Sequence, residues 1–316
     1  MKKIETQRHL IKFYGTIFFG FLPIVGLGSL MIFIGFNNEM KNESDNEHII
    51  TSIFGSLFCL LAIWMVYLYW KSSPKIIINK NSIKIGKETF NLNSIQDVIL
   101  TGKMPLRFIL DHPMEGTAIL FKDGTEKILF DDMYSNSYLV KSFLEQVIVK
   151  KQEFKINSPK EINKNKLQFE STEKFKGNQF TTSRGISFWG IIVFMTFIFT
   201  ANGLILKLGG FIFFSLVITF WIVLHYWLLH YFEMTKKFLI IKNHIFIWKL
   251  KIYDLSDIKE VVFETQSNRP NCLRVITNNF KNKLYPAGTL SDKTWLEMKK
   301  RLESRGVHVR NECIYE

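Results

Sequence analysis

The chain carries one sequence pattern twice, and this duplication constrains its fold more than any other feature. Two long apolar stretches precede a basic segment with strand periodicity at residues 75–100, and the same order recurs at 238–263. A constant offset of 163 residues aligns the two basic segments without a gap: it matches Ile77 with Ile240, Ile78 with Ile241, Phe90 with Tyr253, Leu92 with Leu255, Ile95 with Ile258 and Val98 with Val261. The sequence therefore predicts two copies of one unit, each a membrane hairpin followed by a small domain.

Four nearly uncharged stretches are long enough to cross a membrane, because about 20 apolar residues in a helix span roughly 30 Å of hydrocarbon. The predicted spans cover residues 13–36, 49–70, 186–206 and 208–232. The first stretch is too long for a signal peptide and lacks its small-residue cleavage site, so we interpret it as a retained span.

The distribution of Lys and Arg predicts the orientation of these spans. Residues 1–12 hold four Lys or Arg, whereas the loop 37–48 holds four acidic residues and one Lys. Lys and Arg also flank the later spans on the side of the long polar segments. Because cytoplasmic loops are enriched in Lys and Arg, both termini and both polar segments are expected in the cytoplasm. The three cysteines indicate neither a disulfide framework nor a metal site.

The polar segments have the periodicity of small β-rich domains. Apolar and polar residues alternate in Ser82–Lys87 and again in Thr89–Asn93, which favours half-buried strands. In the first copy Asp123-Gly124 marks a hairpin turn, and Ser135 or Asn136 can cap a final amphipathic helix. The second copy has a turn at Asn278-Asn279 and a helix that starts at Ser291 or Asp292, with Trp295, Met298 and Leu302 on one face.

Short antiparallel strands closed by one C-terminal helix are the outline of a pleckstrin-homology-like (PH-like) fold. The chain resembles the bacterial PH-like membrane proteins, in which transmembrane hairpins precede such domains. The matching pieces are an entry strand just after a span, at Lys75–Ile78, and two related stretches, Asn91–Val98 and Asp254–Val261. The resemblance implies a fold and a membrane setting rather than an activity.

We therefore expect an α-helical membrane protein with four transmembrane helices in two hairpins and two α+β PH-like cytoplasmic domains. Each domain is expected to be a bent antiparallel sheet capped by a C-terminal helix. The linker between the copies is expected to be irregular or to complete a strand. The predicted boundaries are 1–12 for a cytoplasmic N-terminus, 13–70 for hairpin 1, 71–151 for domain 1, 152–185 for the linker, 186–232 for hairpin 2 and 233–316 for domain 2.

Three groups of residues suggest chemistry, and for each the structural interpretation is favoured. His225 and His230 could hold haem or a metal, but a spacing of five does not place them on one helix face, so an interfacial aromatic belt is preferred. The segment 111–115 mixes acids with His112 as hydrolytic sites do, yet a solvated loop is preferred. Asp131-Asp132 could bind a cation, although a turn before a helix is preferred. We expect no enzymatic activity, catalytic residue, metal or cofactor.

The net charge of +13 is the main functional signal, because it collects on the side predicted to face anionic headgroups. Candidate lipid- or partner-binding residues are Lys75, Lys80, Lys84 and Lys87 in the first copy and Lys236, Lys237, Lys242, Lys249 and Lys251 in the second. The positive-inside bias alone explains these lysines equally well.

We therefore expect a non-enzymatic scaffold protein of the bacterial inner membrane. Its predicted partners are membrane lipids and a protein or peptide. Nucleic acid is not expected, because the basic residues are not interleaved with exposed aromatic residues. The alternative hypothesis is a pore, a pore-blocking protein or an immunity-type protein that acts through its helices, motivated by the glycine-rich first span.

Overall fold

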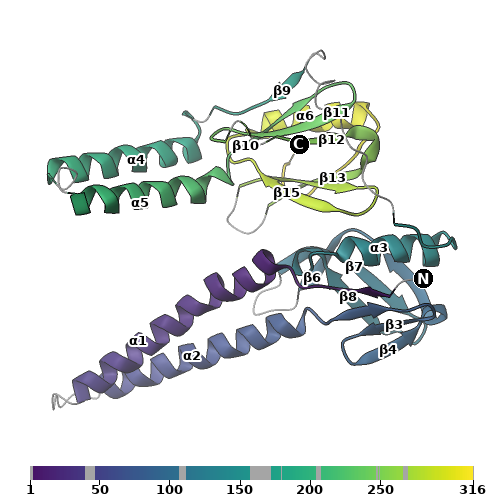
Figure 1. Ribbon diagram of the computed structural model, residues 1–316, viewed down its shortest axis with the longest axis horizontal. Coiled ribbons are helices and arrows are strands. Elements are labelled where there is room, and N and C mark those ends of the chain that lie inside the picture. The colour runs from purple at the N-terminus through teal and green to yellow at the C-terminus, as the bar shows by residue number, and fades with distance from the viewer. Residues whose placement is uncertain are drawn as a thin grey trace. The chain divides into compact units, whose positions relative to one another are not determined.

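The computed structural model describes residues 3–39, 47–106, 112–156, 172–178, 180–203, 208–246, 248, 250–265 and 270–315. The chain divides into two units, Met1–Asn157 and Ser158–Glu316. Each unit contains a helical hairpin and a β-rich part (Figure 1). The protein is therefore a mixed α+β protein with several antiparallel sheets.

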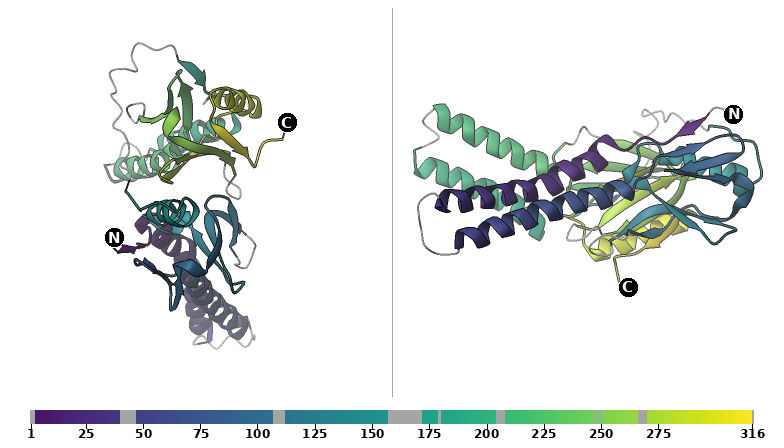
Figure 2. Two further views of the ribbon diagram at one scale, coloured as in Figure 1. Left: turned by 90° about the vertical axis from the view of Figure 1, so that its right-hand side faces the viewer. Right: turned by 90° about the horizontal axis from the view of Figure 1, so that it is seen from below.

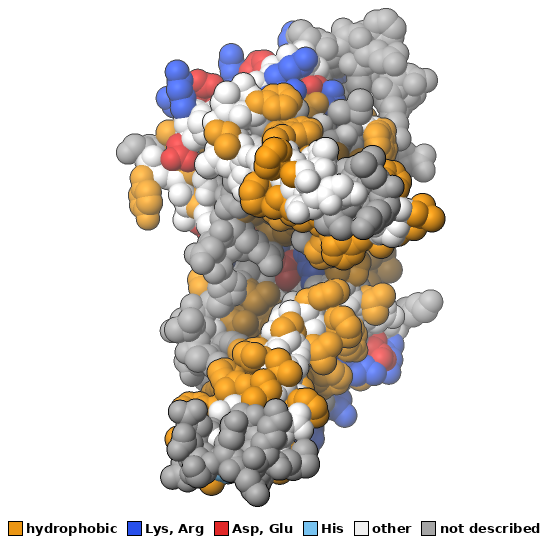
Figure 3. Space-filling view, turned by 90° about the vertical axis from the view of Figure 1, so that its left-hand side faces the viewer, with side chains coloured by type: hydrophobic (Ala, Val, Ile, Leu, Met, Phe, Trp, Pro, Cys, Tyr) orange, Lys and Arg blue, Asp and Glu red, His pale blue; other side chains and the backbone are white. Residues whose placement is uncertain are grey.

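The hairpin of unit 1 consists of α1 (Leu22–Glu39) and α2 (Glu47–Lys71), which lie side by side along their length (Figure 2). Two π-helical turns, η1 (Leu10–Tyr14) and η2 (Ile17–Phe21), precede α1. The stretches Leu10–Asn37 and His48–Lys71 are long and apolar enough to cross a membrane, with mean hydropathies of 2.4 and 2.3. Their large apolar side chains are mostly exposed, and they form much of the hydrophobic surface in Figure 3.

Small residues allow the two helices of unit 1 to pack closely. A Cβ atom added to Gly28 would lie 2.7 Å from the backbone oxygen of Gly55, and one added to Gly35 would meet Ser52. Small residues at a helix contact are the usual way in which membrane helices approach each other. Gly28 and Gly35 of α1 thus contribute to packing within the hairpin.

The first sheet of unit 1 has the strand order β1-β2-β3-β4. Its strands are β1 (Ile4–Glu5), β2 (Ile76–Ile78), β3 (Ser82–Ile85) and β4 (Glu88–Asn91). Strand β1 precedes the helical hairpin and β2 follows it, yet they pair antiparallel, with Glu5 opposite Ile77. The hairpin is therefore an insertion between two neighbouring strands of one sheet. Residues 1–12, predicted to be a separate N-terminus, contribute the first strand.

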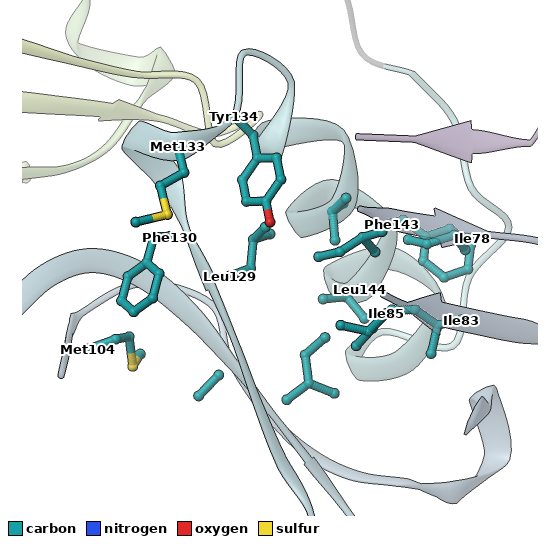
Figure 4. Packing of buried hydrophobic residues seen from close by; sticks show 14 of the residues in the cluster. Ile78, Ile83, Ile85, Met104, Leu129, Phe130, Met133, Tyr134, Phe143 and Leu144 are labelled. Atoms are coloured by element: carbon teal, nitrogen blue, oxygen red, sulfur yellow. The ribbon is translucent and has the colours of Figure 1, made fainter. Parts of the chain in front are cut away.

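The second sheet of unit 1 is built around β7 (His112–Phe121). Its neighbours are β5 (Ile95–Ile99), β6 (Lys103–Leu106) and β8 (Glu126–Phe130). Helix α3 (Ser137–Phe143) and the π-helical segment η5 (Leu144–Val149) follow. Both sheets and this helix pack on one core, with Phe143 and Leu144 fully buried near Ile78 and Ile83 (Figure 4).

Unit 2 repeats this plan. Helices α4 (Ser183–Ala201) and α5 (Leu208–Tyr226) form its hairpin. The first sheet has the order β12-β11-β10-β9, from β9 (Glu173–Phe175), β10 (His230–Met234), β11 (Phe238–Asn243) and β12 (Lys251–Asp254). The second has the order β15-β14-β13-β16, from β13 (Ile258–Glu264), β14 (Cys272–Thr277), β15 (Asn282–Pro286) and β16 (His308–Asn311). Helix α6 (Asp292–Ser304) closes the core with Trp295, Met298 and Leu302, as predicted.

The prediction of four transmembrane helices is wrong. Only two helices among the described residues meet the length and hydropathy needed to cross a membrane, and both belong to unit 1. The apolar helical stretches of unit 2 are shorter, at Gly185–Ala201 and Leu208–Val223. The paired strands show why: 72 positions separate Glu5 from Ile77, but 59 separate the equivalent Lys174 and Glu233. The second insertion is therefore 13 residues shorter, and part of the apolar sequence after 226 forms β10 instead of helix.

The strand registers also correct the alignment of the two copies. Phe90 pairs with Ile83, and Tyr253 pairs with Leu239, so β11 corresponds to β3 rather than to β2. Ile240 consequently takes the place of Lys84 instead of Ile77, and Ile241 takes that of Ile85. The offset is 156 there because the connection between β11 and β12 is seven residues longer than that between β3 and β4. The other four matched pairs, Phe90/Tyr253, Leu92/Leu255, Ile95/Ile258 and Val98/Val261, occupy equivalent positions, so these predictions are confirmed.

Two turns were predicted between strands. Gly124 has a φ of +80° in the connection of β7 and β8, as the Asp-Gly turn requires. At the turn predicted at Asn278-Asn279 in unit 2, the residue with positive φ is Phe280, at +60°. Asn279 contributes its side chain instead, which accepts a hydrogen bond from the Thr277 hydroxyl at 2.5 Å.

Candidate functional site

The base of the unit 1 hairpin is tied to the β-rich part through Arg8. This residue follows β1 and precedes the first helical turn. Its guanidinium carbon lies 3.9 Å from the ring centre of Trp70, at the end of α2. Its Nη2 donates to the Ser73 carbonyl oxygen at 2.9 Å, and its Nε donates to Ser73 Oγ at 3.1 Å. One cation therefore joins both ends of the insertion.

Further contacts hold this joint between the hairpin and the β-rich part. Phe13 is fully buried and stacks on Tyr69 with ring centres 5.1 Å apart. The Tyr134 hydroxyl donates to the Pro74 carbonyl oxygen at 2.6 Å, and burial raises the pKa of this hydroxyl. The His9 backbone N–H donates to the Met133 carbonyl oxygen at 2.8 Å. The hairpin is thus packed on the β-rich part of unit 1 and is not attached by a flexible linker.

Asp131 and Asp132, considered as a possible cation site, are each paired with a lysine. Asp131 accepts a hydrogen bond from Lys141 at 2.6 Å, and both side chains are buried. Asp132 accepts one from Lys12 at 2.5 Å, which adds a contact to the joint. The two residues lie in the short 3-10 turn η4 (Asp131–Met133) before α3, so the preferred interpretation as a turn is confirmed.

Three of the predicted lysines of unit 1 lie at the hairpin end of the first sheet. Lys75 is exposed between α2 and β2 and pairs with Glu5. Its carbonyl oxygen accepts a hydrogen bond from Gly86, the residue before the exposed Lys87. Lys84 lies opposite Ile77 on the solvent face of β3. With Lys71, the exposed last residue of α2, these four form the hairpin-end lysines.

Lys80 lies at the opposite end of this sheet, in the turn between β2 and β3. Lys236 and Lys237 occupy the equivalent turn between β10 and β11 in unit 2. All three side chains are exposed. Strand β2 leads away from the end of α2, and β10 leads away from α5. These three residues, the far-end lysines, therefore lie at the end of each sheet that is away from its own hairpin (Figure 1). The predicted lysines of unit 1 therefore do not form one face.

The remaining predicted lysines belong to unit 2. Lys242 on β11 is partly buried, and its Nζ lies 2.8 Å from the carboxylate of the buried Glu233. Lys251 is exposed at the start of β12, with its Nζ 5.6 Å from the ring centre of Tyr253. Lys249 lies outside the described residues. Lys242 is therefore the predicted lysine with the clearest structural role.

The two histidines considered as haem or metal ligands have separate environments. His225 on α5 packs against Trp221, with ring centres 3.7 Å apart and the rings tilted by 40°. The Nδ1 of His230, on β10, lies 3.0 Å from the Pro286 carbonyl oxygen. Across the part of the chain that the structure describes, no three His, Cys, Asp or Glu side chains group as a metal site.

The segment 111–115 shows no acid–base pair among the residues that the structure describes. Asp111 lies outside the described residues, and of His112 only the backbone is described, at the start of β7. Glu115 is buried, and its carboxylate accepts a hydrogen bond from the Gly102 backbone N–H at 2.7 Å. The segment predicted as a solvated loop is therefore largely a strand, and Glu115 stabilises a turn.

The sequence interpretation missed the joint residues Arg8 and Tyr134 and the buried Lys141, which pairs with Asp131. An Arg just before a long apolar helix and a Trp near the end of the next one are a weak signal that they meet. Comparison of the chain with protein-family models, curated proteins and solved structures finds no match.

Proposed function

We propose that this protein is a non-enzymatic binding or scaffold protein of the bacterial cytoplasmic membrane. The hairpin of unit 1 anchors it, and both β-rich units face a protein, peptide or anionic-lipid partner in the cytoplasm. The pairing of Glu5 with Ile77 across the hairpin carries this proposal. Because the two strands belong to one sheet, both ends of the hairpin lie on the same side of any membrane that α1 and α2 cross.

The charge distribution supports the cytoplasmic orientation. Arg8, Lys12 and Lys71 flank the hairpin where it joins the sheet, whereas the loop 37–48 between the helices is acidic. Positive residues are retained on the cytoplasmic side of membrane helices. We therefore place unit 1 and both termini in the cytoplasm, as a protein that crosses the membrane more than once. The resemblance to the PH-like membrane proteins stays a prediction.

The joint supports a role at the membrane surface. Because Arg8, Phe13 and Tyr134 pack the hairpin on the β-rich part, the sheet is held in one orientation near the headgroups. That orientation brings the hairpin-end lysines close to the membrane and keeps Lys80, at the other end of the same sheet, away from it. Each well-placed lysine contributes about 1 kcal/mol to attraction by anionic lipid.

A comparison of two single variants in unit 1 tests the lipid contact. The hairpin-end variant is Lys87→Ala, and the matched far-end variant is Lys80→Ala, an exposed turn lysine at the other end of the same sheet. Native mass spectrometry of the purified full chain counts the retained phosphatidylglycerol. One contact of about 1 kcal/mol corresponds to a loss of about fivefold in affinity for the hairpin-end variant. An equal loss in the far-end variant would contradict lipid binding at the hairpin end.

Cysteine labelling tests the orientation. In a background without the native cysteines, Asp45→Cys and Asn81→Cys report the loop between the helices and the far end of the sheet. We expect an impermeant maleimide added to intact cells to label the first position alone. Labelling of Asn81→Cys in intact cells would overturn the proposed topology.

A further inference from the structure

The two units differ at one sheet edge. In unit 2, β13 has neighbours on both sides, because β16 pairs with it in parallel and β14 pairs antiparallel. In unit 1, the equivalent strand β5 pairs with β7 alone among the described residues. Both strands carry the same irregularity, at Ile95/Asp97 and at Ile258/Glu260, which fixes their correspondence. We call the side of β5 away from β7 the β5 edge.

Strand β16 shows what fits such an edge. His308 lies opposite Glu260, Val309 opposite Val261 and Arg310 opposite Val262. The Glu260 carboxylate lies 3.7 Å from both His308 Nδ1 and Arg310 Nη2, and Val309 is buried between these two basic residues. The occupant of the β13 edge is therefore an extended segment with the pattern basic–apolar–basic.

The β5 edge keeps the features that hold β16. Asp97 takes the place of Glu260, and Val98 takes that of Val261. Asp97 is exposed, Val98 is half-buried, and Ile99 is 53 % exposed. An acidic residue at this position matches the charge of a basic segment, and the apolar neighbours provide surface for its central residue.

The backbone of the β5 edge is also suited to an added strand. Phe263 O accepts a hydrogen bond from Glu312 N at 2.9 Å, so the polar groups of Phe263 point toward the β16 side. Because backbone polar groups alternate in direction along a strand, the N–H and C=O of Val261 also point toward β16. At the equivalent Val98, the N–H donates to Asp97 Oδ1 at 2.8 Å. A side chain of the same strand thus takes the place of the neighbouring strand's carbonyl oxygen.

Unit 1 has its own counterpart of β16, but it is held elsewhere. Lys151 and Gly306 follow the final helices of the two units, and both have positive φ, 52° and 77°. After Lys151 the chain returns along the helix. The Gln146 side chain donates to the Lys155 carbonyl oxygen at 3.0 Å and accepts from its N–H at 2.7 Å. The amide of Gln146 thereby satisfies the backbone groups with which Lys155 could pair in a sheet.

From these observations we propose that the β5 edge binds an extended basic–apolar–basic segment of a partner protein as a parallel strand, with Asp97 facing its basic side chains. The inference rests on the proposed function as a binding protein and names the class of its peptide partner. Strand addition to an open edge is a common mode of peptide recognition.

A labelled peptide tests this proposal on the full chain. The probe is a synthetic peptide with the sequence of residues 306–312, Gly-Val-His-Val-Arg-Asn-Glu, read by fluorescence anisotropy against the protein in nanodiscs of neutral lipid. We expect saturable binding that Asp97→Lys weakens about tenfold, since a like charge replaces the opposite one. A peptide with Glu in place of its His and Arg should bind the Asp97→Lys variant better than it binds the unsubstituted protein.

Glu126→Lys is the matched control, because Glu126 is exposed on β8, on the other side of β7 from β5. It should leave the affinity unchanged. Absence of saturable binding, equal weakening by both variants, or failure of the charge-reversed peptide would overturn the proposal. Binding that is indifferent to Asp97→Lys would place the peptide elsewhere, for example on β13, and would overturn it as well. If the protein retained phosphatidylglycerol but did not bind the peptide, peptide binding at the β5 edge would be refuted. The proposed membrane-anchored function would not be affected by that result.

Discussion

Arg8 and Trp70 are 62 positions apart in the chain, yet the guanidinium carbon lies 3.9 Å from the indole ring centre. The same guanidinium donates to the Ser73 carbonyl oxygen at 2.9 Å. The contact therefore joins the residue that enters the hairpin to the residues that leave it. It ties the hairpin to the sheet, which is the geometry on which the proposed lipid contact depends.

We expect Arg8→Ala to lower the free energy of unfolding by roughly 1–3 kcal/mol. The variant loses the cation–π contact and leaves the Ser73 carbonyl oxygen without the guanidinium donor. The free energy of unfolding of Arg8→Lys should lie between those of Arg8→Ala and the unsubstituted protein, because a lysine keeps the charge but not the planar guanidinium. Thermal unfolding of the full chain in detergent measures the effect. Lys3→Ala is the control, since the Lys3–Glu5 pair is exposed, and an equal loss there would contradict the role of the joint.

The packing of α1 on α2 gives a second prediction, with a control on the same helix. Gly28→Leu should destabilise the hairpin by about 1–3 kcal/mol, because even its Cβ atom would lie 2.7 Å from the Gly55 oxygen. Gly26→Leu should be nearly neutral, since Gly26 has no neighbour within 4 Å of an added Cβ. Unfolding of both variants in the same detergent compares them. Equal losses in the two variants would contradict a specific role for close packing at Gly28.

Long periodic elements were predictable from the sequence. The first hairpin and the face of α6 that carries Trp295 and Met298 follow from hydrophobic patterns over three or more turns. The Asp-Gly turn follows from the conformational freedom of Gly124. These features are local, so a single stretch of chain contains the information that determines them.

Pairing between distant segments was not predictable. Strands β1 and β9 have two and three residues, too few to show any periodicity, and their partners lie beyond a hairpin. The second hairpin was misread because hydropathy does not distinguish a helix end from a buried strand such as β10. Ile77 and Ile240 are the same residue type, so they aligned in sequence although they are not equivalent. This match concealed that the connection between β11 and β12 is seven residues longer than that between β3 and β4.

The candidate site shows the same division between local and distant information. Counting charges identified lysines such as Lys80 and Lys87, but only the strand registers show that they lie at opposite ends of one sheet. Asp97 lies within the stretch Asn91–Val98, and no pattern in the sequence distinguishes it. Its significance comes from the equivalence to Glu260, which depends on the pairing of β16 with β13.

A buried ion pair gives a third prediction, because unit 2 replaces it with apolar residues. Ala287 occupies the position of Asp131, and Leu296 that of Lys141. Lys141→Leu alone should cost about 3–5 kcal/mol, since it leaves Asp131 as a buried charge without its lysine. The double variant Asp131→Ala/Lys141→Leu should recover most of this loss. Chemical denaturation of the unsubstituted protein, the single variant and the double variant measures these free energies of unfolding. A double variant as unstable as Lys141→Leu would contradict this account.

The last prediction concerns acid stability and His244. Burial, reinforced by the nearby Lys176 and His230, lowers the pKa of His244 from its ordinary value of 6.5 to about 4. Its Nε2 lies 3.2 Å from Thr289 Oγ1, and its ring lies 4.8 Å from that of Tyr231. The folded protein therefore keeps this imidazole neutral at a pH where the unfolded chain protonates it.

Between pH 6.5 and about 4 the unfolded state binds the extra proton, so His244 makes the protein progressively less stable as the pH falls through this window. His244→Gln should remove that part of the pH dependence, worth roughly 1 kcal/mol after allowance for the exposed part of the ring. Burial also lowers the pKa of His9, so some acid sensitivity remains in the variant. Unfolding midpoints at pH 7 and pH 4.5 measure the difference, with His308→Gln as the exposed control. A His244→Gln variant that loses as much stability on acidification as the unsubstituted protein would show that this histidine is not responsible.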